Sequence, residues 1–483
     1  MPLFGGNQRA ARRSWSTLPA LLATRGTMKP SKVLIERCSS YDPEALSTAL
    51  GKFARLFDTI VRPGDRVVLK PNWIAPHHRY RHDEWESVIT HPSFISAVLR
   101  EVVQRLDRRG SVIITDGPQT DSSFASIMSH MAVEDWQRIA AQHGIDFAVL
   151  DLRDMEWREV GDVIFDRRKL PGDPLGSVEF NLGDFSNFHG HSPSSRGYYG
   201  ADYDIAETTA AHTNGNHRYR VSRTVISADL FINLPKLKTH KKAGVTCSLK
   251  NLVGINTYKN FLPHHTEGTP MMGGDQFPSD SWGSTSEVLL LERFKRLLLR
   301  YKRYGRVFIP LKRAGRLIFG ETKQKIRSGN WYGNDTLWRM ILDLNALLLY
   351  GKPDGAFREP AFTEQKRYLS IIDGVIAGEG NGPEAPDPFP AGVILGGLNP
   401  LSVDCAAVKL MGFDYQKIPS LKHGFDARHF PLCDCTYNEI DVASTSLAEF
   451  NGRLLDVPSS ACFHFRPHFG WRGHIEAPEP VAS

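Results

Sequence analysis

The residues best suited to chemistry follow one short apolar run near the middle of the chain. Residues 225–256 read VISADLFINLPKLKTHKKAGVTCSLKNLVGIN. The first part is typical of a buried strand, because its apolar residues are closely spaced and partly β-branched: Val225, Ile226, Leu230, Phe231, Ile232 and Leu234. Pro235 ends this strand, and Lys236, Lys238 and His240 follow it. Ligands of open α/β sheets bind outside the carboxyl ends of the strands, so we place the functional site here.

The residue types in this segment indicate an anion site with proton transfer. Lys236 and Lys238 are two residues apart, so in an extended segment both side chains project to one side and can clamp an anion. A desolvated lysine can act as a base or form a Schiff base, and we assign a catalytic role to Lys238. His240 is a candidate acid or base because histidine titrates near neutral pH. A solvated lysine-rich loop is the alternative interpretation.

The apolar residues after Gly244 recur at helical spacing, which predicts a strand, a cationic turn and a helix in succession. Lys250 and Asn251 lie inside this otherwise apolar helix, where a solvated lysine is not expected. We therefore predict that both residues contact the substrate.

Polar residues also follow other predicted strands. Lys70 and Asn72 come directly after one apolar run, Asp116 after a second and Asp373 after a third. We expect the first two to bind substrate and Asp116 to orient a catalytic group. Asp116 and Asp373 could also hold a divalent cation, although Asp-Gly after a strand is a common turn.

A glycine-rich segment follows the last of these strands. Gly380, Asn381 and Gly382 would let backbone N–H groups approach an anion, so we include them among the substrate-binding residues. The two common phosphate loops, G-x-x-x-x-G-K-[ST] and G-x-G-x-x-G after a strand, are absent.

These motifs resemble the family catalogued as domain of unknown function 362. The resemblance rests on INLPKLKTH and GVTCSLKNLVG in the central segment, with further similar runs at 67–72, 113–117, 371–374 and 378–383, and it covers most of the chain from about residue 28 to residue 412. The family has no defined activity. Some relatives look like iron–sulfur proteins with ferredoxin-type cysteine clusters, and this chain departs from them.

The alternation of predicted strands and helices indicates an α/β fold, with a mainly parallel sheet flanked by helices, an irregular insertion and a basic helical arm. We divide the chain into a disordered extension (1–27), a first α/β half (28–150), a loop-rich insertion (151–223), the central motif with a lid (224–290), the basic arm (291–330), a second α/β part (331–415) and an irregular tail (416–483).

The basic arm dominates the charge of the protein. Residues 293–327 contain thirteen Lys and Arg and one acid, whereas the whole chain has a formal net charge of only +6. The arm suits a helix packed on the body with solvated basic side chains, or one lying on an anionic membrane. Nucleic acid is the least favoured partner.

Metal and compartment predictions rest on cysteines, histidines and hydropathy. The six cysteines are scattered and lack cluster spacing, which argues against an iron–sulfur centre and favours reduced thiols in the cytoplasm. Cys247 lies in the central motif and is expected to be a buried, inert thiol.

Seven histidines between residues 189 and 265 show no H-E-x-x-H spacing. No apolar run reaches about eighteen residues, as a membrane helix requires.

We expect an enzyme acting on a small or carrier-linked anionic metabolite, a carboxylate or a phosphate, through lysine, histidine and aspartate side chains. Its reaction type does not follow from the sequence. The alternative is a non-catalytic ligand-binding or redox protein related to the iron–sulfur members of the family.

Overall fold

The computed structural model describes residues 31–160, 163–193, 197–202, 204–278, 326, 328–426 and 429–478. The predicted extension 1–27 lies outside these residues, and so does the basic arm 291–330 apart from residues 326 and 328–330. The interpretations attached to the arm therefore stay predictions. Within the described ranges, no helix combines the length and hydrophobicity needed to span a bilayer.

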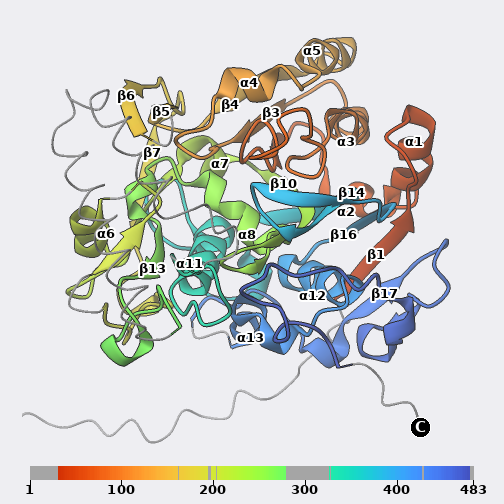
Figure 1. Ribbon diagram of the computed structural model, residues 1–483. Coiled ribbons are helices and arrows are strands. Elements are labelled where there is room, and N and C mark those ends of the chain that lie inside the picture. The colour runs from red at the N-terminus through yellow and green to blue at the C-terminus, as the bar shows by residue number, and fades with distance from the viewer. Residues whose placement is uncertain are drawn as a thin grey trace, which may run out of the picture.

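The chain folds as an α/β protein around one large mixed sheet (Figure 1). Five neighbouring strands run parallel and form its centre: β4 (Asp146–Asp151), β3 (Ser111–Asp116), β2 (Arg66–Pro71), β10 (Leu230–Leu234) and β14 (Arg367–Asn381). Beyond β14 the sheet continues through β16 (Val393–Gly397), β1 (Lys32–Arg37), β17 (Asp441–Ala443) and β18 (Gly452–Arg453), where β16 is antiparallel to both of its neighbours. The predicted mainly parallel sheet is confirmed.

Helices cover both faces of this sheet, as Figure 1 shows. One face packs against α1 (Pro43–Gly51), α2 (Ala54–Ile60), α3 (Pro92–Arg105) and α5 (Val133–Gln142), and the other against α8 (Cys247–Asn251), α11 (Leu337–Tyr350) and α12 (Pro400–Leu410). Successive residues of a strand point to opposite faces. Ile232 of β10 accordingly joins the first core and Phe231 the second. Burial on both faces explains why these strands are continuous apolar runs in the sequence.

Small sheets and short helices surround this body. They are α4 (Phe124–Met128), β5 (Met155–Val160), β6 (Val163–Lys169), β7 (Ser177–Asn181), β8 (Tyr198–Gly200), α6 (Ile205–Ala211), β9 (Arg218–Ser222), α7 (Arg223–Ser227), β13 (Pro263–Thr266) and α13 (Pro419–Lys422). Strands β11 (Lys236–His240), β12 (Gly244–Val245) and β15 (Ala385–Phe389) extend the large sheet beside β14. The short strands β5 to β9 occupy the segment 151–223, for which loops and short strands are predicted.

Three local predictions are wrong. Val225 and Ile226 belong to α7 rather than to the central strand, because the Ser222 side chain accepts a hydrogen bond from the Val225 N–H and caps a helix there. The predicted cationic turn is strand β11, which pairs with β14. The strand predicted to end at residue 372 runs on to Asn381, because β11 and β15 pair with its second half.

Candidate functional site

The carboxyl ends of the central strands bring the predicted polar residues to one edge of the sheet. Lys70 lies opposite Asn233 in the β2–β10 pair, and Lys236 lies opposite Asp373 in the β11–β14 pair. Asp116 ends β3, the other neighbour of β2. Because these strands are parallel, the ends near Lys70, Asp116, Pro235 and Asp373 share the edge predicted for them.

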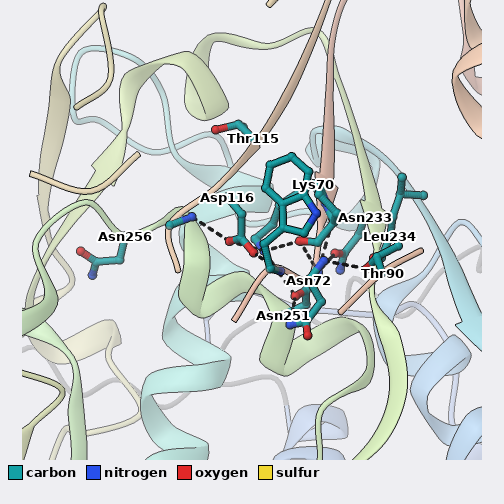
Figure 2. A network of polar contacts seen from close by, with 12 residues as sticks. Lys70, Asn72, Thr90, Thr115, Asp116, Asn233, Leu234, Asn251 and Asn256 are labelled. Carbon is teal, nitrogen blue, oxygen red and sulfur yellow. Dashed lines mark hydrogen bonds and ion pairs between the residues drawn. The ribbon is translucent and has the colours of Figure 1, made fainter. Parts of the chain in front are cut away.

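Lys70 and Asp116 form a fully internal ion pair at this edge (Figure 2). The Lys70 Nζ lies 2.7 Å from Asp116 Oδ1, and it also donates to the Pro71 carbonyl at 3.0 Å and to Asn251 Oδ1 at 3.3 Å. Burial lowers the pKa of Lys70, and the Asp116 carboxylate opposes that shift. With three acceptors around its three N–H donors, Lys70 has no donor left for a ligand.

Asp116 is held just as completely. Its oxygens accept hydrogen bonds from the Trp73 N–H at 2.7 Å and the Gly117 N–H at 2.8 Å, in addition to the Lys70 contact. Gly254 packs so closely that a Cβ there would overlap the Asp116 carboxylate. The predicted role of orienting a lysine fits this geometry, but that lysine is Lys70 and the pair stabilises the fold.

Asn251 connects strands β2 and β10. Its Nδ2 donates to Asn233 Oδ1 at 2.7 Å, and its Oδ1 accepts from Asn72 Nδ2 at 2.8 Å. Figure 2 shows these side chains converging with Lys70. Asn72 is fixed further by the Thr90 hydroxyl, which accepts from its backbone N–H at 2.8 Å. The amides predicted to bind substrate thus bond to one another inside the protein, although the buried Asn72 Oδ1 has no hydrogen-bond partner within the described residues.

A second internal ion pair joins Lys236 to Asp373. The Lys236 Nζ lies 2.8 Å from Asp373 Oδ2 and donates to the Tyr41 hydroxyl at 2.8 Å. That hydroxyl donates to Asp373 Oδ1 at 2.8 Å, and the His91 N–H donates to Oδ2 at 3.0 Å. Burial and the adjacent carboxylate raise the pKa of Tyr41 well above its ordinary value. Sequence reasoning missed Tyr41, which no local motif marks.

Asp116 and Asp373 do not form the shared metal site that the sequence suggested. Strands β2 and β10 lie between β3 and β14, so three interstrand spacings separate the two residues by about 14 Å. Each carboxylate is neutralised by its own lysine. Within the described ranges, no group of three or more His, Cys, Asp or Glu side chains is placed to hold a metal ion.

Lys238 is also internal, but its hydrogen-bond partners are backbone carbonyls rather than a carboxylate. Its side chain is fully buried, and its Nζ donates to the Val88 carbonyl at 2.5 Å and the Pro383 carbonyl at 3.2 Å. Burial, with Lys236 and Lys250 nearby, lowers its pKa well below the ordinary value. This ammonium group ties β11 to two distant loops, which is the geometry of a structural lysine rather than of a Schiff base.

His240 is a hydrogen-bond donor rather than a group that titrates near neutrality. Its Nδ1 accepts from the backbone N–H groups of Lys242 and Ala243, both at 3.1 Å, so the ring proton lies on Nε2. Burial and the adjacent lysines, Lys250 first, lower its pKa well below the ordinary value. Burial, with the positive charge of the adjacent lysines, favours the neutral ring, whereas the predicted acid–base role assumed titration near neutral pH.

The glycine-rich segment does not cradle an anion with its glycine amides. The Gly380 N–H donates to the Arg466 carbonyl at 2.7 Å, and the Gly382 N–H donates to the Gly380 carbonyl at 3.0 Å. Asn381 is exposed at the hairpin between β14 and β15. Gly382 packs against the Thr239 carbonyl, where a Cβ would overlap it. These glycines therefore permit a close turn.

Lys250 is a predicted site residue for which the described part of the chain supplies no partner. It lies in the last turn of α8 and is 9% exposed, and no hydrogen bond or salt bridge to its side chain occurs within these residues. Burial and the neighbouring cations Lys259 and Lys70 lower its pKa to about 7. An anionic ligand would supply the acceptor that the described residues do not offer to this amine.

Lys250 is surrounded by three basic residues, and sequence reasoning did not select any of the three. Burial and Lys241 lower the pKa of Lys242 to about 7, and burial lowers that of Lys259 to about 8. Burial lowers the pKa of His264, and Lys242 and Lys250 lower it further. We name Lys242, Lys250, Lys259, His240 and His264 the lysine–histidine cluster. The sequence signal for this cluster is the high density of basic residues over 236–265, which is visible only when the segment is considered as a whole.

The comparison with protein families agrees with the sequence motifs. The model of the family described as domain of unknown function (DUF362) matches residues 195–409. These residues form a DUF362 domain. The domain contains the lysine–histidine cluster and Lys236, Lys238 and Asp373, whereas Lys70 and Asp116 precede it in the chain. The DUF362 domain therefore completes its internal network with residues from outside its own matched range.

The other comparisons add little to the DUF362 assignment. No curated protein matches the sequence. Among solved structures, the lactate racemase apoprotein from Thermoanaerobacterium thermosaccharolyticum is similar over 78% of this chain and 57% of its own, at 10% identity and a TM-score of 0.29. The protein thus spans little more than half of that racemase, and a TM-score of this size does not indicate a shared activity.

A thiol beyond the DUF362 domain differs from the other cysteines. A hydrogen bond from the Cys433 thiol lowers the pKa of Cys435 to about 7, whereas burial raises the pKa of Cys247 and Cys405 well above the ordinary value. The thiolate is the reactive form. We expect iodoacetamide at neutral pH to alkylate Cys435 about tenfold faster than Cys247 or Cys405, measured by peptide mass spectrometry.

The matched control for this labelling is Cys433→Ala, which removes the donor and should slow alkylation of Cys435. Equal rates at Cys435 in the variant and the wild type would contradict the assigned cause.

Proposed function

We propose that the protein is an enzyme acting on a small or carrier-linked anionic metabolite, and that Lys250 binds the anionic group. The observation that carries this proposal is the nine-tenths buried Lys250 side chain, which lacks an acceptor within the described residues. Lys242 and Lys259 add positive charge beside it. An anion would supply the acceptors and the negative charge that this cluster lacks.

The proposed catalytic roles follow from protonation states. General acid–base catalysis works best when the pKa of the group is near the working pH. Lys250 and Lys242, each with a pKa of about 7, meet that condition. His240 does not, and its Nε2–H instead serves as a neutral donor to an oxygen of the substrate. Lysine thus replaces histidine as the candidate proton carrier.

A second candidate function is anion binding without catalysis. It is favoured by the two predicted site carboxylates, because Asp116, predicted to be catalytic, and Asp373, predicted as a metal ligand, are each engaged by a lysine and by backbone N–H groups. Turnover of the ligand that remains bound through purification separates the two candidates. Recovery of that ligand unchanged after incubation with candidate co-substrates favours the binding role.

Lys250→Met should lower ligand retention while leaving the fold intact. Methionine has a similar length and no charge, so the anion loses a charge-assisted contact worth about a tenfold to hundredfold change in affinity. The bound ligand is measured by mass spectrometry of denatured protein, and folding by thermal unfolding. The exposed Lys352 provides the matched control, and Lys352→Met should change neither ligand retention nor the unfolding temperature.

Lys238→Met should behave in the opposite way. It leaves the carbonyls of Val88 and Pro383 without their buried donor, so unfolding should shift to lower temperature. Any loss of ligand should follow the loss of folded protein. If Lys250→Met also loses ligand only in proportion to folded protein, Lys250 is structural and the proposed site is wrong.

Binding should also depend on pH. Sulfate keeps its charge across the neutral range, and its affinity should fall as pH rises above about 7, by about tenfold per pH unit for each lysine that must be protonated. Ionisation of Asp202 and Asp275, whose burial raises each pKa to about 6, acts in the same direction. Lys250→Met should flatten this profile in calorimetric titrations. An affinity that rises with pH would contradict the assignment.

A further inference from the structure

The lysine–histidine cluster offers more hydrogen-bond donors than the described part of the chain accepts. A lysine ammonium has three N–H donors. Lys250 uses none of them, while the Lys242 Nζ donates to His265 Nδ1 at 3.2 Å and keeps two. Lys259 Nζ donates to the carbonyls of Gly117 at 2.9 Å and Asn256 at 3.1 Å and keeps one. These three lysines therefore have more spare donors than a carboxylate has lone-pair positions, which number about four.

The two histidines add one donor and one acceptor. The His240 proton lies on Nε2, because Nδ1 accepts two backbone hydrogen bonds. In His264 the Nδ1 donates to the Leu262 carbonyl at 2.8 Å, so Nε2 carries the lone pair. Burial and the adjacent lysines depress the pKa of both rings, which remain neutral. A ligand group with several acceptor oxygens and one hydroxyl would match this set.

The charge balance points the same way. Lys70, Lys236 and Lys241 each form a salt bridge with a carboxylate. For Lys242, Lys250 and Lys259, the described ranges contain no carboxylate within salt-bridge distance. A single carboxylate group would neutralise one of three neighbouring ammonium groups, whereas a phosphoryl group carries up to two charges.

We infer that the anion bound by the lysine–histidine cluster is a phosphoryl group, either of a phosphate monoester or of inorganic phosphate. This inference rests on the proposed function, because it names the anion held by the same side chains. Three terminal oxygens accept the spare N–H donors, and a protonated phosphoryl oxygen can donate to His264 Nε2. A monocarboxylate satisfies fewer of these groups and leaves more buried positive charge.

Isothermal titration with three probes tests the inference: glycerol phosphate, inorganic phosphate and acetate, at constant ionic strength and about pH 6.5. Glycerol phosphate or inorganic phosphate should bind at least about tenfold more tightly than acetate. Lys250→Met and Lys242→Met should each weaken phosphate binding by about tenfold or more, and Lys352→Met should leave it unchanged. Circular dichroism checks that each variant is folded.

The outcomes separate this inference from the proposed function. Acetate bound through Lys250 at least as tightly as both phosphates overturns the phosphoryl assignment and leaves the anion site standing. Phosphate binding that is equal in the wild type and in folded Lys250→Met overturns both. Failure of both phosphates to bind at millimolar concentration overturns the phosphoryl assignment. A preference for the ester over inorganic phosphate, or the reverse, identifies the source of the group.

Discussion

Replacing Lys70 by methionine should destabilise the protein by about 3–5 kcal/mol, because it leaves the buried Asp116 carboxylate without its cation. The Lys70 Nζ also donates to Asn251 Oδ1 and to the Pro71 carbonyl, so the substitution removes a donor shared by β2 and α8. Urea unfolding monitored by circular dichroism measures the loss as a lower midpoint.

The double variant Lys70→Met with Asp116→Asn is the informative control. It removes both charges, and replacing both members of a buried ion pair costs much less than removing one. We therefore expect it to recover part of the stability lost in Lys70→Met. A single variant as stable as the wild type would contradict the stabilising role assigned to the Lys70–Asp116 pair.

Replacing Gly254 by alanine should have a comparable effect through packing alone. The new Cβ would overlap Asp116 Oδ1 and lie 2.8 Å from Lys70 Nζ. Both atoms belong to the buried ion pair, so neither can move without breaking a hydrogen bond. Overpacking of this kind costs about 1–3 kcal/mol, and more where the neighbours are fixed. The change is measured by the same urea titration.

Gly51 gives the matched control at a glycine with open space around it. It ends α1, and a Cβ there meets no atom within 4 Å. Gly51→Ala should be neutral or stabilise by about 0.5–1 kcal/mol, because alanine favours helix. Equal stability of Gly254→Ala and Gly51→Ala would mean that the chain around Gly254 adjusts freely.

The strands were predictable because their signal is local. Strands β10, β2 and β3 are short apolar runs, since both of their faces are covered by helices. Their polar ends were predictable too, because parallel strands place their carboxyl ends on one edge. Helix α7 was missed because its apolar residues resemble strand residues, and only the Ser222 cap distinguishes them.

The division of roles among the lysines was not predictable. Lys236, Lys238 and Lys250 look equivalent in the sequence, as basic residues in an apolar setting. Lys236 meets Asp373 and Lys238 meets the Pro383 carbonyl, which lie 137 and 145 residues further along the chain. Lys250 meets no acceptor within the described residues. Residue type and spacing carry no information about such distant partners.

The sequence by itself determined the α/β class, the family resemblance and the sheet edge where basic and amide side chains gather, because each depends on local hydrophobic periodicity or on a contiguous motif. Only the tertiary structure decided that Lys70, Lys236 and Lys238 are bonded to acceptors inside the protein, whereas Lys250 has none within the described residues, which is the observation behind the proposed anion site. The physical reason is that a buried ammonium group needs an acceptor, and its acceptors come from segments that only folding brings together.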